Sequence, residues 1–153
     1  MIIENTTIDE KDYLNFVLAK MYLLENESVL NSAFRNFCFE NFSQFQSNLE
    51  LYQNLHSFVF YNFTYKEDLD NQEILISPKH NIFIKSGDCD DFALFIKSVL
   101  RVFNIPAFYI LLGKNENEYS HIAVITHDNF LIDGTNDQFN QIPNEYKFFK
   151  VIK

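Results

Sequence analysis

The residues of this chain that could do chemistry centre on one cysteine. Cys89 follows a glycine turn at Gly87 and opens directly into apolar residues at helical spacing. A histidine, His121, and an aspartate, Asp133, come later on segments with the apolar character of strands. A thiol at a helix start becomes a nucleophile when a histidine takes its proton and an acid orients that histidine. These residue types in this order predict acyl transfer through a Cys-His-Asp triad.

The groups around Cys89 act in opposite directions on the pKa of its thiol. A free thiol has a pKa of roughly 8.5, and a helix N-terminus or a nearby imidazolium lowers it. Asp88, Asp90 and Asp91 raise it, because like charge disfavours the thiolate. A stable thiolate therefore requires His121 very close to the sulfur.

Other polar residues near Cys89 are expected to support it. Asp88 and Asp91 have the positions of helix-capping acids, which the positive end of the helix dipole favours. The backbone N–H of Cys89 is a natural donor to an oxyanion, and Tyr65 or Asn62 could supply a second hydrogen bond.

Structural interpretations of the three candidate residues stay open. Cys89 could be a small buried apolar side chain, as free cysteines often are. His121 could be a hydrogen-bonded core histidine, and Asp133 could serve the turn before Gly134.

A metal site is the leading chemical alternative to the triad. Its ligands would be the acids and the thiol of residues 88–91, with His80 or His121. Consecutive residues at a helix start point in different directions, so they cannot converge on one ion. The spacing also matches neither a zinc pattern nor a calcium loop. We therefore expect no metal and no cofactor.

Apolar spacing predicts the elements that must position these residues. The first 60 or so residues are mostly helical, beginning with a helix capped at Thr7 and interrupted at polar residues 25–28. A short strand or an extended exit from the last helix is expected at 60–65, and a loop at Ser77 to His80. The helix that starts at Cys89 ends at Asn104-Ile105-Pro106. Strands are expected over four segments, which are 107–112, 121–126, 130–133 and 148–152. Helices followed by a mainly antiparallel sheet make an α+β fold.

Length and composition limit the class of protein. The 153 residues, 47% hydrophobic with 18 Phe and 8 Tyr, suit a single domain over 1–153 with an aromatic core. We divide it into a helical N-terminal region, 1–55, and a catalytic core, 56–153. A net charge of −9 without a basic cluster argues against nucleic acid as a partner. No apolar stretch is long enough for a bilayer and no secretory signal is visible, so we expect a soluble, cytoplasmic protein with Cys89 reduced and Cys38 in the core.

Successive motifs resemble the transglutaminase-like cysteine enzymes. The motifs are Gly87-Asp88-Cys89-Asp90-Asp91-Phe92-Ala93, Asn104-Ile105-Pro106-Ala107, Ser120-His121-Ile122-Ala123-Val124 and Leu131-Ile132-Asp133-Gly134-Thr135. The resemblance covers roughly residues 55–137. It implies a papain-like core in which the helix carrying Cys89 packs on an antiparallel sheet that carries His121 and Asp133.

The chain departs from the family pattern at three places. The Trp that often follows the histidine is replaced by Val124 and Ile125, the usual Asp-Pro-Thr has Gly134 in place of proline, and the glycine before Ile-Pro is Asn104. Asn also accepts the left-handed conformation of a helix C-terminus, so the last change is mild.

The resemblance and the triad together predict cysteine-dependent hydrolysis of a peptide or amide bond. Protein crosslinking by amine transfer is one alternative, and a non-catalytic module that binds a protein through the same cleft is another. The expected partner is a peptide or protein substrate, and a compact domain of this kind looks like those of bacteria and their phages.

Overall fold

The computed structural model describes residues 2–4, 10–70 and 72–153. The helices are α1 (Glu10–Leu30), α2 (Ser32–Phe42), α3 (Asn48–Asn62), α4 (Pro78–Ile84) and α5 (Cys89–Val102). The strands are β1 (Ile2–Glu4), β2 (Thr64–Tyr65), β3 (Gln72–Ile74), β4 (Ser86–Gly87), β5 (Ala107–Gly113), β6 (His121–Thr126), β7 (Leu131–Ile132) and β8 (Phe148–Ile152). The predicted α+β class and the mostly helical N-terminal region are confirmed.

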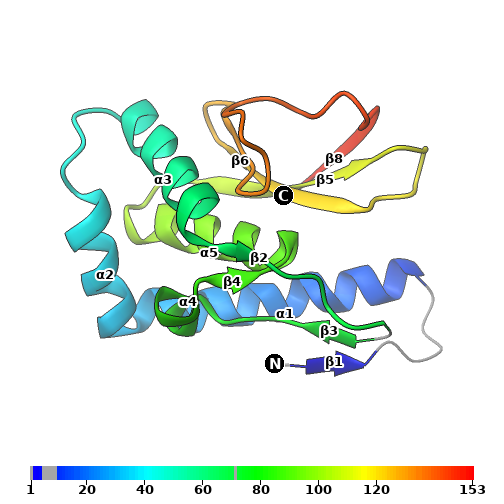
Figure 1. The fold of residues 1–153 in the computed structure, drawn as a ribbon, viewed down its shortest axis with the longest axis horizontal. Coiled ribbons are helices and arrows are strands. Elements are labelled where there is room, and N and C mark those ends of the chain that lie inside the picture. The colour runs from blue at the N-terminus through cyan, green and yellow to red at the C-terminus, as the bar shows by residue number, and fades with distance from the viewer. Residues whose placement is uncertain (1, 5–9, 71) are drawn as a thin grey trace.

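Helix α5 is the centre of the molecule, between α1 on one side and the sheet on the other (Figure 1). Its apolar stripe is buried, with Phe95, Ile96 and Val99 fully inaccessible. It ends where Asn104 adopts φ 57° before Ile105 and Pro106, as the sequence predicts.

The main sheet has the strand order β7-β6-β5-β8 with every neighbouring pair antiparallel. Register pairs Leu112 with His121 and Val124 with Ile132. The three segments β5, β6 and β8 match the predicted strands closely, and β7 is shorter than predicted. The register places His121 at the start of β6, while Asp133 directly follows β7.

Aromatic side chains fill the space between α5 and the helices α2 and α3. Phe95 contacts Phe34 edge to face at 6.0 Å and Phe63 at 4.8 Å between ring centroids. Phe58 stacks on Phe95 at 6.4 Å. Cys38 is fully buried in the same cluster, as predicted. Large rings of this kind supply much of the apolar burial that holds the helices on α5.

The predicted interruption at residues 25–28 is wrong, because α1 continues through it to Leu30. The polar side chains there have partners inside the protein. Glu25 is fully buried and its carboxylate accepts hydrogen bonds from Lys97 at 2.8 Å and Arg101 at 3.3 Å, both on α5. Ser28 lies 3.1 Å from the hydroxyl of Ser77. Buried polar groups are tolerated when they are paired in this way.

Two other expectations need correction. Residues 77–80 are not a loop, because Pro78 takes the first position of α4, where a missing N–H costs nothing. The strand expected at 60–65 is confined to Thr64–Tyr65, since α3 runs on to Asn62. β2 then pairs in parallel with β4, which joins Tyr65 to Gly87 in register. The N-cap proposed at Thr7 lies outside the described residues.

Among the described residues, no helix combines the length and the hydropathy needed to cross a membrane.

Candidate active site

The turn before α5 positions Cys89 as the first residue of the helix. Gly87 has φ +141°, and a Cβ there would overlap the carboxylate of Asp91. Asp88 accepts a hydrogen bond from the Asp90 N–H at 3.1 Å, and Asp91 accepts one from the Asp88 N–H at 3.1 Å. This capping box confirms the predicted capping roles of Asp88 and Asp91.

His121 and Asp133 form a close pair on neighbouring strands. His121 Nε2 lies 2.7 Å from Asp133 Oδ2, and the two side chains are only 10% and 2% exposed. The Thr135 hydroxyl donates to Asp133 Oδ1 at 2.7 Å and its backbone N–H donates at 3.0 Å. Burial alone would raise the pKa of Asp133, yet the hydrogen bonds and charge of His121 and Thr135 hold it below its usual value. Asp133 is therefore an ionised acceptor that fixes the orientation of the imidazole.

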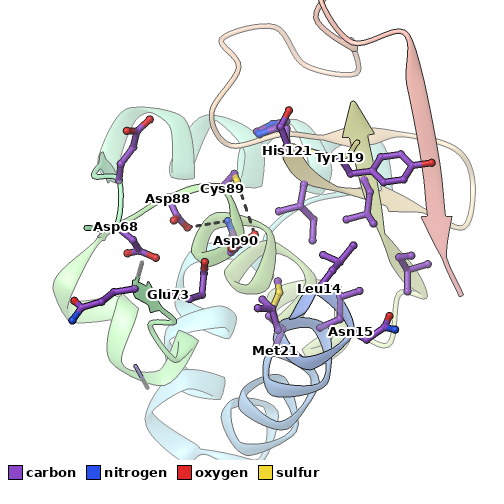
Figure 2. A pocket seen from close by; sticks show the side chains of 18 of the residues that line it. Leu14, Asn15, Met21, Asp68, Glu73, Asp88, Cys89, Asp90, Tyr119 and His121 are labelled. Atoms are coloured by element: carbon purple, nitrogen blue, oxygen red, sulfur yellow. Dashed lines mark hydrogen bonds between the residues drawn. The ribbon is translucent and has the colours of Figure 1, made fainter. Parts of the chain in front are cut away.

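Cys89 and His121 line the same cleft, which has a volume of about 850 Å³. Figure 2 shows Cys89 at the top of α5 with His121 on the sheet beside it. The backbone N–H of Ile122, the residue after His121, donates a hydrogen bond to the Cys89 sulfur. The structure thus brings the three predicted site residues into one region. The Ile122 N–H links Cys89 to the strand that carries His121, and His121 is hydrogen-bonded to Asp133.

The surroundings of Cys89 favour its protonated thiol over the thiolate. Cys89 Sγ lies 3.9 Å from Asp90 Oδ1, and the cysteine is half-buried. Burial, followed by the charges of Asp90 and Asp88, raises the pKa of Cys89 well above its usual value. The acids expected from the sequence to oppose the thiolate do so, and burial, which that expectation left out, is the largest cause.

Two contacts around the His121–Asp133 pair were not predicted. Tyr146 stacks on His121, with ring centroids 5.4 Å apart and planes 9° apart. A Cβ on Gly134 would come within 2.5 Å of Val59 on α3. The transglutaminase-like pattern usually has proline at this position, and here there is no room for its ring. Tyr146 follows in a loop far along the chain from His121, and no spacing in the sequence connects them.

The two residues proposed as second oxyanion donors differ in position. Tyr65 lines the cleft, where partial desolvation and the acidic groups around Cys89 raise the pKa of its phenol. Asn62 instead donates its amide to the Phe58 carbonyl of its own helix at 2.9 Å. Tyr65 is the better placed of the two.

A cluster of three carboxylates lies beside Cys89, and it was not predicted from the sequence. Ligand oxygens of Asp68, Glu73 and Asp88 lie within 4.8 Å of one another (Figure 2). Burial and the neighbouring acids raise the pKa of Glu73 to about 10 and of Asp88 to about 8. Oxygen ligands of this kind suit a hard cation such as Ca²⁺. The set that was considered and rejected from the sequence, residues 88–91 with a histidine, shares only Asp88 with this cluster, because Asp68 and Glu73 come from the segment before α4.

Comparison with known proteins assigns the fold. The family model of the transglutaminase-like domain matches residues 18–146. No curated protein sequence matches the chain significantly.

Solved structures with the same fold come from three bacteria. A candidate cysteine protease from Cytophaga hutchinsonii is 17% identical, with a TM-score of 0.55 over 88% of this chain and 48% of its own. A candidate protease from Parabacteroides distasonis is 12% identical, with a TM-score of 0.59 over 83% of this chain and 26% of its own. Calcium-bound LapG from Legionella pneumophila is 18% identical, with a TM-score of 0.56 over 84% of this chain and 80% of its own. The chain therefore spans about half of the first protein and about a quarter of the second.

Proposed function

Because the chain belongs to the transglutaminase-like domain family, we propose that it is a cysteine hydrolase that cleaves a peptide or amide bond with Cys89, His121 and Asp133. The observation that carries the proposal is the shared cleft. A thiol at the start of α5 and a histidine paired with a buried carboxylate open into the same 850 Å³. The candidate proteases with this fold support the same reaction class.

In the proposed reaction, Cys89 Sγ attacks the carbonyl carbon while His121 removes the thiol proton. The raised pKa of Cys89 means that proton transfer accompanies attack, instead of a resting ion pair. His121 Nε2 is held by Asp133, so Nδ1 is the nitrogen that takes the proton. The charge that develops on the imidazole is stabilised by the ionised Asp133.

The carbonyl oxygen becomes an oxyanion that the backbone N–H of Cys89 would bind, with the Tyr65 hydroxyl as the second donor. The C–N bond then breaks, and His121 gives its proton to the leaving amine. Water attacks the thioester while His121 takes a proton from it. The C–S bond breaks, the acid leaves and the thiol of Cys89 is restored.

The proposal is tested with internally quenched peptides and with an amine acceptor, dansylcadaverine, supplied beside a glutamine-containing protein. We expect peptide cleavage by the wild-type chain and none by Cys89→Ala, with the far-ultraviolet circular dichroism of the two unchanged. His121→Ala should lower kcat by about a thousandfold or more. Turnover that survives Cys89→Ala would move the site elsewhere, and incorporation of the amine without cleavage would make the protein a crosslinking enzyme.

A further inference from the structure

The cleft around Cys89 has two walls of different chemistry. The apolar wall comes from α1 and from the sheet, and its side chains include Leu14, Leu18, Leu111, Ile122 and Ile152. Leu14 and Leu18 are half-buried, so part of each remains free to contact a ligand. Half-exposed apolar side chains beside a nucleophile fit a large apolar side chain of a substrate.

The opposite wall is acidic. It comes from the segment between β2 and β3, from β3 itself and from the start of α5. Its carboxylates are Glu67, Asp68, Asp70, Glu73, Asp88 and Asp90. Apart from His121, Lys150 is the one basic side chain among the described residues that line the cleft. In Figure 2, Asp68, Glu73 and Asp88 lie to the left of the cleft, and Leu14 and Met21 lie to the lower right of Cys89.

The acids of this wall repel one another. Carboxylate oxygens of Asp68, Glu73 and Asp88 lie within 4.8 Å of one another. A cationic group between them removes part of that repulsion, and an anionic group adds to it. Because Asp90 lies 3.9 Å from Cys89 Sγ, a cation bound there sits next to the reacting bond.

We propose that the cleft selects peptides in which a large apolar side chain and a Lys or Arg flank the bond that Cys89 attacks. The apolar side chain packs on Leu14 and Leu18 of α1, and the cationic one lies against Asp68 and Asp90. The inference rests on the proposed function for its reacting bond, but the two contacts are binding properties that can be measured without turnover.

The test uses a set of internally quenched eight-residue peptides that differ at two positions. The first position holds Phe or Ser, and the second holds Lys, Ser or Glu. Cleavage is measured with the wild-type chain, and binding is measured by fluorescence anisotropy with Cys89→Ala. We expect the Phe–Lys peptide to be cleaved faster and bound more tightly than the Ser–Ser peptide, by roughly tenfold or more in each measurement. The Phe–Glu peptide should be the poorest substrate and the weakest ligand. All measurements are made in EDTA and then repeated with Ca²⁺ in excess of the chelator.

Paired variants assign the preference to the two walls. Asp68→Asn keeps an oxygen that can accept the Ile74 N–H, now bonded at 2.8 Å, so the local fold is preserved. It should lower the preference for Lys over Ser about 2- to 10-fold, while Glu40→Gln on the exposed face of α2 changes nothing. Leu18→Ala should lower the preference for Phe over Ser about tenfold, while Leu23→Ala, an exposed position on the same helix, should not.

The outcomes separate the inference from the proposed function. Binding to Cys89→Ala with the expected preference, but no cleavage by the wild type, supports the two walls and removes the hydrolase. Cleavage without a preference for Lys, or with one that Asp68→Asn leaves unchanged, overturns the inference and leaves the hydrolase. A preference for Glu peptides that appears only when Ca²⁺ is added also overturns it, because the acids would then be metal ligands.

Discussion

Replacing Asp90 with Asn should lower the pKa of the Cys89 thiol. The carboxylate lies 3.9 Å from Cys89 Sγ, and its charge opposes the thiolate. At about this separation, a unit charge is worth about 1 kcal/mol in bulk water and about 4 kcal/mol at an effective dielectric constant of about 20. One pKa unit corresponds to about 1.4 kcal/mol, so Asp90→Asn should lower the thiol pKa by roughly 1 to 3 units.

The assay is the rate of alkylation by iodoacetamide over the neutral to alkaline range, followed by mass spectrometry of the peptide that contains Cys89. The second cysteine provides an internal control, because Cys38 is fully buried and desolvation raises its pKa to about 12. Glu40→Gln is the matched variant, since it removes one negative charge from an exposed position on α2. Cys89 should be alkylated faster at neutral pH in Asp90→Asn than in either the wild type or Glu40→Gln.

An unchanged or higher midpoint in Asp90→Asn would contradict the assignment of Asp90 as a cause of the raised thiol pKa. A shift of equal size in Glu40→Gln would show that net charge, and not the contact to Asp90, sets the midpoint. Either result would also weaken the argument that proton transfer to His121 accompanies nucleophilic attack.

Three further predictions follow from packing and charge. Gly134→Ala should lower the free energy of unfolding by about 1 to 3 kcal/mol, because the added Cβ meets Val59. In urea unfolding, the double variant with Val59→Ala should lose less stability than the two single variants together. Tyr146→Leu should lower kcat several-fold and move the pH dependence of kcat/KM, whereas Tyr146→Phe keeps the ring on His121 and should do neither; equal losses in both variants would contradict a stacking role. Because the pKa of Glu73 is raised, its contribution to stability is complete below about pH 4 and is lost as pH rises toward 10. In thermal unfolding, Glu73→Gln should therefore reduce the decline in Tm between acidic and neutral pH. An unchanged decline would refute this.

The parts of the fold that follow from local patterns were predictable from the sequence. The helix from Cys89 has a cap, an apolar stripe and a terminating Asn104, and each signal is local. The strands that carry His121 and precede Asp133 are apolar runs bounded by turns. Periodicity and turn chemistry are sufficient for such elements.

The errors came from residues whose structure depends on distant partners. Polar Glu25 indicated a break in α1, but Lys97 on α5 pairs with it and keeps the helix intact. The cluster of Asp68 and Glu73 with Asp88 is formed by tertiary structure, as is the stack of Tyr146 on the catalytic candidate His121. Contacts between segments far apart in one sequence leave no periodic signal within either segment.

The first helix has a consequence for engineering. α1 spans Glu10–Leu30, and the family match begins at residue 18, so the helix crosses the boundary of the shared domain. It is anchored to α5 through Glu25 near its C-terminal end, whereas Leu14 and Leu18 contribute to the cleft from its N-terminal half. The anchor and the cleft-lining residues are thus separate. Libraries that vary the exposed positions of α1 around Leu14 and Leu18 should redirect the selectivity of this protein while the triad and the anchor at Glu25 keep their native sequence.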